Sequence, residues 1–357
     1  MDSVRHEPTV SALPTPALGT SPKRVRTCSA LGRGRPAGLA VLLAIVFAGC
    51  SDDESDRGSG SSSGPAGPEH PIASAGHPVV YASGTEEQFH LWLMEEDGAA
   101  PVQLTRGEGA ELGPVWSPDG FRIAFVAASD MTDDFDLWMI DADGTQLHQL
   151  TDTDDVWEGV PSWSPDGQHL AYSHSVGGID EGGEVRVLDV DDPDAEQTTI
   201  ADRGDWPAWS PDGDTILYSG DAGGTSALFT VPAAGGEATE LETDGPPGAS
   251  EASWSPDGTR IAFVASSGDP DAEDPVRWNE DIWVMDTDGT HARKVVSTEG
   301  NDHWMPTWSP DGGHLMFTAD GTEKDGEIVR VDLTSGEVIP VTDNEVHDMM
   351  PSWRPAD

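Results

Sequence analysis

Acidic and histidine side chains recur shortly before a repeated tryptophan, and their types could bind positive charge. Four of them stand five positions before the tryptophan, one stands four before it and one stands three before it. The set comprises Glu111, Glu158, Asp205, Glu251, His303, His347 and Asp348, where His347 is the chain neighbour of Asp348. Carboxylates and imidazoles gathered in one place suit a metal ion or a basic peptide. The alternative is that these acids cap turns and solvate loops, which the acidic composition favours.

A divalent cation is the cofactor that these side chains would hold, either a transition metal or calcium. His303 and His347 are the candidate transition-metal ligands, because neutral imidazole is a common metal ligand. An EF-hand-like loop has ligands at positions 1, 3, 5 and 12, which are here Asp269, Asp271, Glu273 and Glu280. Position 6 is Asp274 where such loops need glycine, and no helical pattern flanks the segment. We therefore expect a solvated acidic loop there.

Catalytic motifs are missing or out of context in this sequence. Gly60–Gly64 matches the G-x-S-x-G nucleophile elbow, but that motif needs a strand before it and a helix after it. It lies instead in a low-complexity segment, and no HExxH or Gly-rich phosphate loop occurs. The sequence therefore favours a binding protein over an enzyme. The alternatives are a carbohydrate-active lyase or hydrolase, or a divalent-cation-binding protein.

The tryptophans belong to a repeat whose spacing predicts the elements that position these side chains. Trp-Ser-Pro-Asp-Gly occurs at 116–120, 163–167, 209–213, 254–258 and 308–312, and a partial copy begins at Trp353. The tryptophans that open these copies are Trp116, Trp163, Trp209, Trp254, Trp308 and Trp353, at intervals of 45 to 54 residues. Pro and Asp-Gly suit a tight hairpin, and tryptophan can fill the gap between neighbouring units. The motif is therefore predicted to be structural.

Each repeat carries the pattern of a four-stranded antiparallel sheet. An apolar strand follows the hairpin at 260–264, a third strand is expected at 281–285, and an Asp-x-Asp-Gly turn ends it at 286–289. A fourth strand is expected at 146–151 of an earlier repeat. Four short strands in about 45 residues is the length of a propeller blade.

The two ends of the repeat region predict one further, shared blade. Residues 78–105 contain a second, third and fourth strand but no tryptophan strand, and 350–353 is a first strand with nothing after it. Pairing them would remove an exposed sheet edge. The expected fold is therefore all-β, a six-bladed propeller over 78–357 closed by its C-terminal strand. The candidate side chains would then surround the mouth of the central funnel.

The repeat resembles that of TolB-type, WD40-like propellers over about residues 78–355. The likeness rests on the Trp-Ser-Pro-Asp-Gly hairpin, the Ile-Ala-Phe strand of 261–263 and the Leu-Thr ending of 150–151. It implies an exported envelope protein that binds other proteins. TolB itself also has an N-terminal α/β domain that engages envelope proteins, whereas here a Ser/Gly-rich and acidic tether is expected over 50–77.

Residues 1–49 are predicted to be a signal peptide of the lipoprotein type. A basic run at 23–35 precedes an uncharged, mostly apolar run from Ala37 to Gly49, which is too short to span a bilayer comfortably. It ends Phe47-Ala48-Gly49-Cys50, which resembles a bacterial lipobox with Cys50 as the lipidated residue. The alternatives are a membrane-anchor helix and a plain secretory signal. The expected location is the cell envelope, periplasmic or at the cell surface, with only the lipid in the membrane.

The charge of the chain restricts its partners. It has 66 Asp+Glu against 18 Lys+Arg, a formal net charge of −48. Such a surface repels nucleic acid and anionic lipid headgroups, and suits a partner with a basic surface. We therefore expect a monomeric, lipid-anchored scaffold that binds an envelope protein or peptide.

Overall fold

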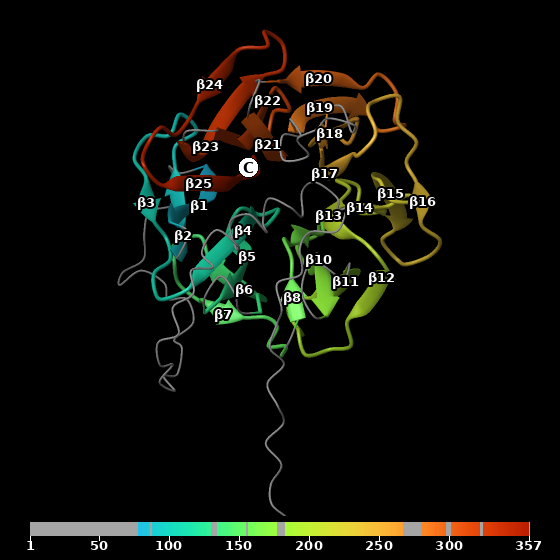
Figure 1. Ribbon diagram of the computed structural model, residues 1–357. Coiled ribbons are helices and arrows are strands. Elements are labelled where there is room, and N and C mark those ends of the chain that lie inside the picture. The colour runs from blue at the N-terminus through green and yellow to red at the C-terminus, as the bar shows by residue number, and fades with distance from the viewer. Residues whose placement is uncertain are drawn as a thin grey trace, which may run out of the picture. The chain divides into compact units, whose positions relative to one another are not determined.

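The computed structural model describes residues 78–85, 88–129, 134–154, 156–176, 183–266, 280–297, 301–321 and 324–356. All of them belong to the unit Gly34–Asp357. The signal peptide, Cys50, the tether, Asp269, Asp271 and Glu273 lie outside the described residues. No helix in the described part has both the length and the apolarity to cross a membrane. The described chain is all-β, and its sheets stand around a common centre in a propeller-like arrangement (Figure 1).

Three of the sheets have four antiparallel strands each. The first consists of β13 (Asp205–Trp209), β14 (Thr215–Asp221), β15 (Ser226–Pro232) and β16 (Thr239–Glu240). The second consists of β17 (Ser250–Trp254), β18 (Arg260–Ser266), β19 (Glu280–Asp286) and β20 (Arg293–Val296). The third consists of β21 (Asn301–Trp308), β22 (His314–Gly321), β23 (Lys324–Asp332) and β24 (Val338–Pro340).

The other two sheets depart from this simple pattern. One has five strands because two short ones share a neighbour: β8 (Val156–Glu158), β9 (Ser162–Trp163), β10 (His169–Val176), β11 (Glu184–Asp189) and β12 (Thr198–Ala201). The other has eight: β1 (Val79–Thr85), β2 (Gln88–Met94), β3 (Val102–Gln103), β4 (Ala110–Trp116), β5 (Arg122–Ala128), β6 (Asp136–Asp141), β7 (His148–Gln149) and β25 (His347–Trp353). A single parallel pair, Phe89 with Ala110, joins its two halves.

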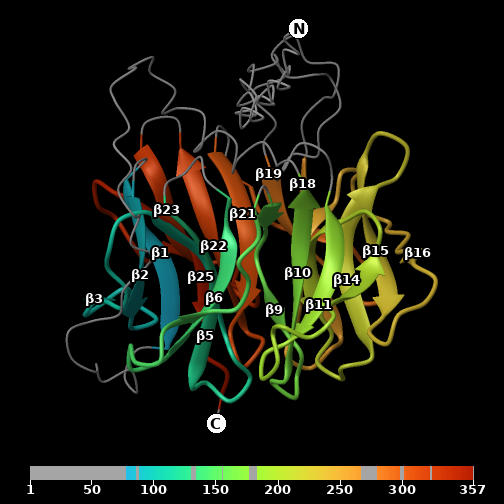
Figure 2. The ribbon, with the colours of Figure 1, turned by 90° about the horizontal axis from the view of Figure 1, so that it is seen from below.

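The first and last described strands are hydrogen-bonded neighbours. β25 runs antiparallel to β1, with Trp353 opposite Val79 and Ser352 opposite Val80. The innermost strands also contact one another in sequence: β4 with β9, β9 with β13, β13 with β17, β17 with β21, β21 with β25, and β25 with β4. Figure 2 shows that the strands of neighbouring sheets lie roughly along the same axis.

The repeat motif forms a hydrogen-bonded tight turn, as the sequence predicts. In all five intact copies the serine hydroxyl donates to the aspartate Oδ1 at 2.6 Å. The same oxygen accepts the backbone N–H two residues further on, as Asp257 does from Thr259 at 3.0 Å. Gly258 then has a φ of 69°, which an L side chain rarely adopts. These bonds from Ser255 and Thr259 lower the pKa of Asp257 to about 2.

The tryptophans pack between sheets, as the sequence predicts. The indole N–H of Trp163 donates to Val115 O at 3.2 Å. The indole N–H of Trp254 donates to Ala208 O at 3.1 Å. The indole N–H of Trp308 donates to Ser253 O at 3.2 Å. Each acceptor lies on the innermost strand of the preceding sheet. The motif therefore builds the hairpin and also joins adjacent sheets.

The fourth strand is shorter than the sequence predicts. The pattern indicates a strand over 146–151, but β7 covers only His148–Gln149. The N–H groups of Leu150 and Thr151 both bond to Leu137 O, at 2.8 and 3.4 Å, so the chain leaves the ladder there. The Thr151 hydroxyl then becomes available to the inner strands.

Candidate functional site

The side chains selected from the sequence all lie on innermost strands. Glu111 is on β4, Glu158 on β8, Asp205 on β13, Glu251 on β17, His303 on β21, and His347 and Asp348 on β25. Five of the seven are buried, whereas Asp205 and His347 are partly exposed. They are thus more enclosed than residues around an open funnel mouth would be.

A bulge that recurs in the inner strands places these side chains. Gly113, Trp206, Glu251, Met305 and Met350 each stand three positions before a repeat tryptophan and have φ between 48° and 58°. The register shifts at the same point in β4, β13, β17 and β21. An extra residue reverses the alternation of faces, so side chains before the bulge point opposite to where a straight strand would aim them.

The bulges also connect neighbouring sheets through their backbone N–H groups. Trp206 N–H donates to Ser173 Oγ at 3.2 Å. In the same way, Glu251 N–H donates to Ser219 Oγ at 3.1 Å. Met350 N–H donates to Thr318 Oγ1 at 3.0 Å. Each hydroxyl belongs to the second strand of the preceding sheet. Met305 N–H has a different acceptor, the Glu251 carboxylate at 2.9 Å.

Glu111 and Glu158 occupy closely similar environments. Glu111 Oε2 lies 2.6 Å from His90 Nδ1 and accepts from the Thr105 hydroxyl at 3.4 Å. Burial raises the pKa of Glu111, and the bonds from His90 and Thr105 oppose that rise.

At the second of these sites, Glu158 accepts from the Thr151 hydroxyl and from Leu137 N–H at 3.2 Å. In both sites the threonine hydroxyl also accepts a backbone N–H from the third strand, that of Leu91 or Leu137. Each carboxylate therefore ties the end of one repeat to the start of the next.

A pair of buried acids, Glu251 and Glu280, forms the most unusual part of the inner region. Glu280 begins β19 and is 2% exposed, and neither of its carboxyl oxygens has a hydrogen-bond partner among the described residues. Burial, together with the nearby charges of Glu251 and Asp302, raises the pKa of Glu280 to about 9. Burial likewise raises the pKa of Glu251 to about 7. Glu280 therefore retains its proton at neutral pH.

His303 borders this pair as a neutral imidazole. Its Nδ1 lies 2.9 Å from the backbone carbonyl oxygen of Glu280, so Nδ1 carries the hydrogen that it donates. The ring meets Phe317 edge-on, with 5.4 Å between centroids. Burial lowers the pKa of His303, which favours the neutral form. His347 is placed differently: its Nδ1 accepts Gly326 N–H at 3.3 Å and its ring lies 6.0 Å from that of Phe89.

The described residues do not form a metal-binding site. Within those residues, no three His, Cys, Asp or Glu side chains are grouped so that they could hold an ion. Of the EF-hand-like set only Glu280 is described, and it belongs to a strand rather than to a loop.

Sequence reasoning missed two features of this region. Glu280 was considered only as a loop position, although it is buried in a strand and the charge of Glu251 raises its pKa. The second feature is the ion pair of Lys294 Nζ with Asp281 Oδ2 at 2.6 Å, where Asp281 is fully buried. The scarcity of lysine was a usable signal, because Lys294 is one of only two lysines after residue 49.

Comparisons with known proteins agree with this architecture. The model of the PD40 family, described as TolB beta propeller domain, matches residues 77–274. The Tol-Pal system protein TolB of Alcanivorax borkumensis is 31% identical over 97 residues, covering 25% of this chain and 20% of that protein. An uncharacterized peptidase of Bacillus subtilis, YuxL, is 32% identical over 124 residues, covering 28% of this chain and 19% of that protein. The chain thus spans about a fifth of the length of these relatives.

A solved structure extends the likeness over most of the chain. TolB from Acinetobacter baumannii superposes with a TM-score of 0.66 at 19% identity, covering 80% of this chain and 68% of that one. At that identity the likeness shows a shared fold. Because the family model matches more than half of the sequence, the chain belongs to the TolB β-propeller family.

Proposed function

We propose that this protein is an exported, lipid-anchored scaffold of the cell envelope that binds a protein or peptide with a basic surface. The observation that carries the proposal is the family match over 77–274 together with the fold shared with TolB. The net charge of −48 supports a basic partner, since opposite charge steers association. The protein would act as a monomer held to the membrane through Cys50.

A rigid six-bladed closed ring is part of this proposal. Its support is the cyclic order of contacts among the innermost strands and the pairing of β25 with β1. The inner carboxylates support it as well, because Glu111, Glu158 and Glu251 are engaged by groups of this same chain. Binding would then fall to the outer surfaces of a ring whose interior serves rigidity.

Two measurements on the full chain in bacterial cells test the proposal. Cys50→Ser should move the mature protein from the detergent phase to the aqueous phase in a detergent partition, with Cys28→Ser as the matched control. A photo-crosslinker placed at exposed Glu96 or Asp152 should trap one defined envelope protein. Retention of Cys50→Ser in the detergent phase would contradict the lipid anchor, and the absence of any specific adduct would contradict the scaffold.

A divalent-cation site is the second candidate function, and one observation favours it. Neither buried carboxyl oxygen of Glu280 has a hydrogen-bond partner among the described residues, and the charges of Glu251 and Asp302 raise its pKa. Calcium or manganese added to chelator-treated protein would then raise its melting temperature, and Glu280→Gln would abolish the rise. His303→Ala should reduce a transition-metal effect but leave a calcium effect intact. Equal melting temperatures with and without the ions would exclude this candidate.

A further inference from the structure

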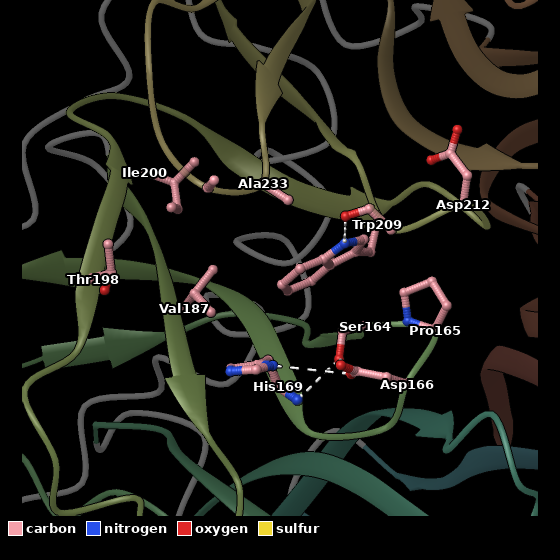
Figure 3. Close-up of a pocket in the computed structure, with 12 residues that line it drawn as sticks. Ser164, Pro165, Asp166, His169, Val187, Thr198, Ile200, Trp209, Asp212 and Ala233 are labelled. Atoms are coloured by element: carbon pink, nitrogen blue, oxygen red, sulfur yellow. Dashed lines mark hydrogen bonds and ion pairs between the residues drawn. The ribbon is translucent and has the colours of Figure 1, made fainter.

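A pocket of about 560 Å³ lies between the sheet of β8 to β12 and the sheet of β13 to β16. Figure 3 shows the indole ring of Trp209 reaching into it, toward Val187 and Ala233. Its wall combines apolar side chains with residues of two hairpin turns, among them Asp166 and Asp212. Every residue that lines the pocket is among those the structure describes.

Two other sheet junctions fill the equivalent place with an arginine, whereas Thr215 and His314 hold the same repeat position elsewhere. Arg122 lies over the Trp163 ring, 4.9 Å from its centroid, and donates to Gly167 O at 2.9 Å. Arg260 repeats this arrangement with the Trp308 ring at 4.6 Å and Gly312 O at 2.9 Å. We call this arrangement of arginine, next-sheet tryptophan and hairpin glycine carbonyl an arginine clamp.

A third junction uses an arginine from a different strand. Arg354, which follows β25, lies 5.4 Å from the centroid of the Trp116 ring. Among the described residues, a guanidinium therefore lies on a repeat tryptophan at three junctions, and it comes from two different positions in the repeat. The indole face is evidently a surface that guanidinium groups fit well.

The clamp lacks its arginine at Trp209. The repeat position of Arg122 and Arg260 is held there by His169, whose ring centroid is 6.2 Å from that of Trp209. Trp209 also differs from the other repeat tryptophans, because its N–H donates to Gly213 O of its own hairpin at 3.1 Å. Gly213 is the counterpart of the clamp glycines Gly167 and Gly312. Its carbonyl has a second lone pair, so it can still accept from a guanidinium.

We propose that this pocket binds an arginine side chain supplied by a basic segment of a partner protein. The guanidinium would stack on Trp209 and donate to Gly213 O, and its aliphatic stem would pack on Val187, Ile200 and Ala233. Asp166 and Asp212 lie in the wall of the pocket and add negative charge to its surroundings. Hydrogen bonds from Ser164 and Ser210 lower the pKa of these two acids, so both are ionised at neutral pH.

Arginine is favoured over lysine by the shape of the site. A guanidinium is planar, stacks on an aromatic face and presents several N–H donors, whereas an ammonium is a compact and strongly hydrated charge. This assignment builds on the proposed role in protein binding, since it names a surface and a residue of the partner. It does not depend on Cys50 or on the envelope location.

Calorimetric titration of the purified full chain with three short peptides tests the proposal. The peptides are acetyl-Gly-Ser-Arg-Ser-Gly-amide and its lysine and citrulline versions, in 150 mM NaCl. The arginine peptide should bind at least about tenfold more tightly than the other two. Trp209→Leu should weaken its binding at least about tenfold.

His169→Arg is the decisive variant, because it supplies the missing arginine from within the chain. It should abolish peptide binding and raise the melting temperature by about 2 °C. His314→Arg is the matched control: it makes the same change at the same repeat position, away from the pocket, and should leave binding unchanged.

Two results would overturn the assignment. One is equal binding of the arginine and lysine peptides, which would mean attraction to acidic surface in general. The other is binding that survives both Trp209→Leu and His169→Arg. If the photo-crosslinked envelope partner were still captured by His169→Arg, the scaffold function would stand and this pocket would not be its contact.

Discussion

At the scale of single residues, acids of this chain fall into two groups. The two groups change the free energy of unfolding in opposite directions as the pH rises. Hydrogen bonds lower the pKa of turn aspartates such as Asp257, from 3.8 to about 2. Such groups stabilise the fold when the pH is above their pKa in the unfolded chain. This stabilisation is lost as the pH falls through their pKa in the folded protein. Burial raises the pKa of Glu280 from 4.5 to about 9. Its contribution is fully present below pH 4.5 and is lost as the pH rises through about 9.

The first prediction concerns Glu280→Gln, which removes the titrating group but keeps its shape. The unfolding free energy of the parent protein should fall between pH 5 and pH 9, because Glu280 and Glu251 ionise in the unfolded chain at lower pH than in the folded one. The variant should have a weaker pH dependence and be more stable at pH 8.5 by about 1–3 kcal/mol. Urea unfolding at several pH values measures both effects.

The exposed residue Glu242 provides the control for this experiment. Glu242→Gln should leave the pH dependence unchanged, since its side chain is exposed in both the folded and the unfolded chain. A pH profile for Glu280→Gln that runs parallel to that of the parent protein would mean that Glu280 is already ionised or hydrated in the folded state.

At the scale of elements, the inner strands are joined by hydroxyls that accept from the bulge N–H groups. Thr318 is fully buried and accepts the N–H of Met350 at 3.0 Å. Thr318→Val keeps the side-chain volume but leaves that N–H buried without its acceptor, which costs about 1–3 kcal/mol. Chemical denaturation should show this loss. Thr239→Val, at an exposed position of β16, should change stability by less than about 0.5 kcal/mol. Equal stability of the two variants would contradict a structural role for the bond.

The elements also explain which features could be predicted from sequence. The hairpins and the second and third strands depend on local chemistry, so the repeated Trp-Ser-Pro-Asp-Gly and its apolar run were sufficient to locate them. The bulge has no such signal, because its positions hold Gly113, Trp206, Glu251, Met305 and Met350. These residues share no turn chemistry, and they adopt a positive φ through contacts with the neighbouring sheet. The enclosure of Glu111 and Glu158 therefore could not be predicted.

The pocket at Trp209 is a second feature that could be predicted only in part from the sequence. Sequence comparison of the repeats reveals that His169 stands where Arg122 and Arg260 stand in other copies. It does not reveal that Trp209 then bonds to its own hairpin, because the indole orientation depends on what the adjacent sheet offers. A substitution inside a repeat is thus visible in the sequence, whereas its structural consequence is not.

At the scale of the whole molecule, stability should depend on the strand that joins the two ends of the described chain. Removal of residues 347–357 deletes β25, so that β1 loses its hydrogen-bonded neighbour. It also removes Trp353 and the contact of Arg354 with the Trp116 ring. An unpaired edge strand invites association with other chains. The truncated protein should therefore melt at least about 10 °C lower, lose its sharp transition and form soluble oligomers.

Complementation distinguishes loss of this strand from general damage to the chain. A synthetic peptide of residues 343–357, added to the truncated protein, should restore the transition, because its backbone can pair again with β1 through the register of Val79 with Trp353. A peptide with Ser352→Pro should fail, since proline removes the N–H of a residue that pairs with Val80. Removal of only 355–357 should have little effect. A truncated protein that remains monomeric and melts like the parent would mean that the ring does not require closure by β25, and the six-bladed closed arrangement would have to be abandoned.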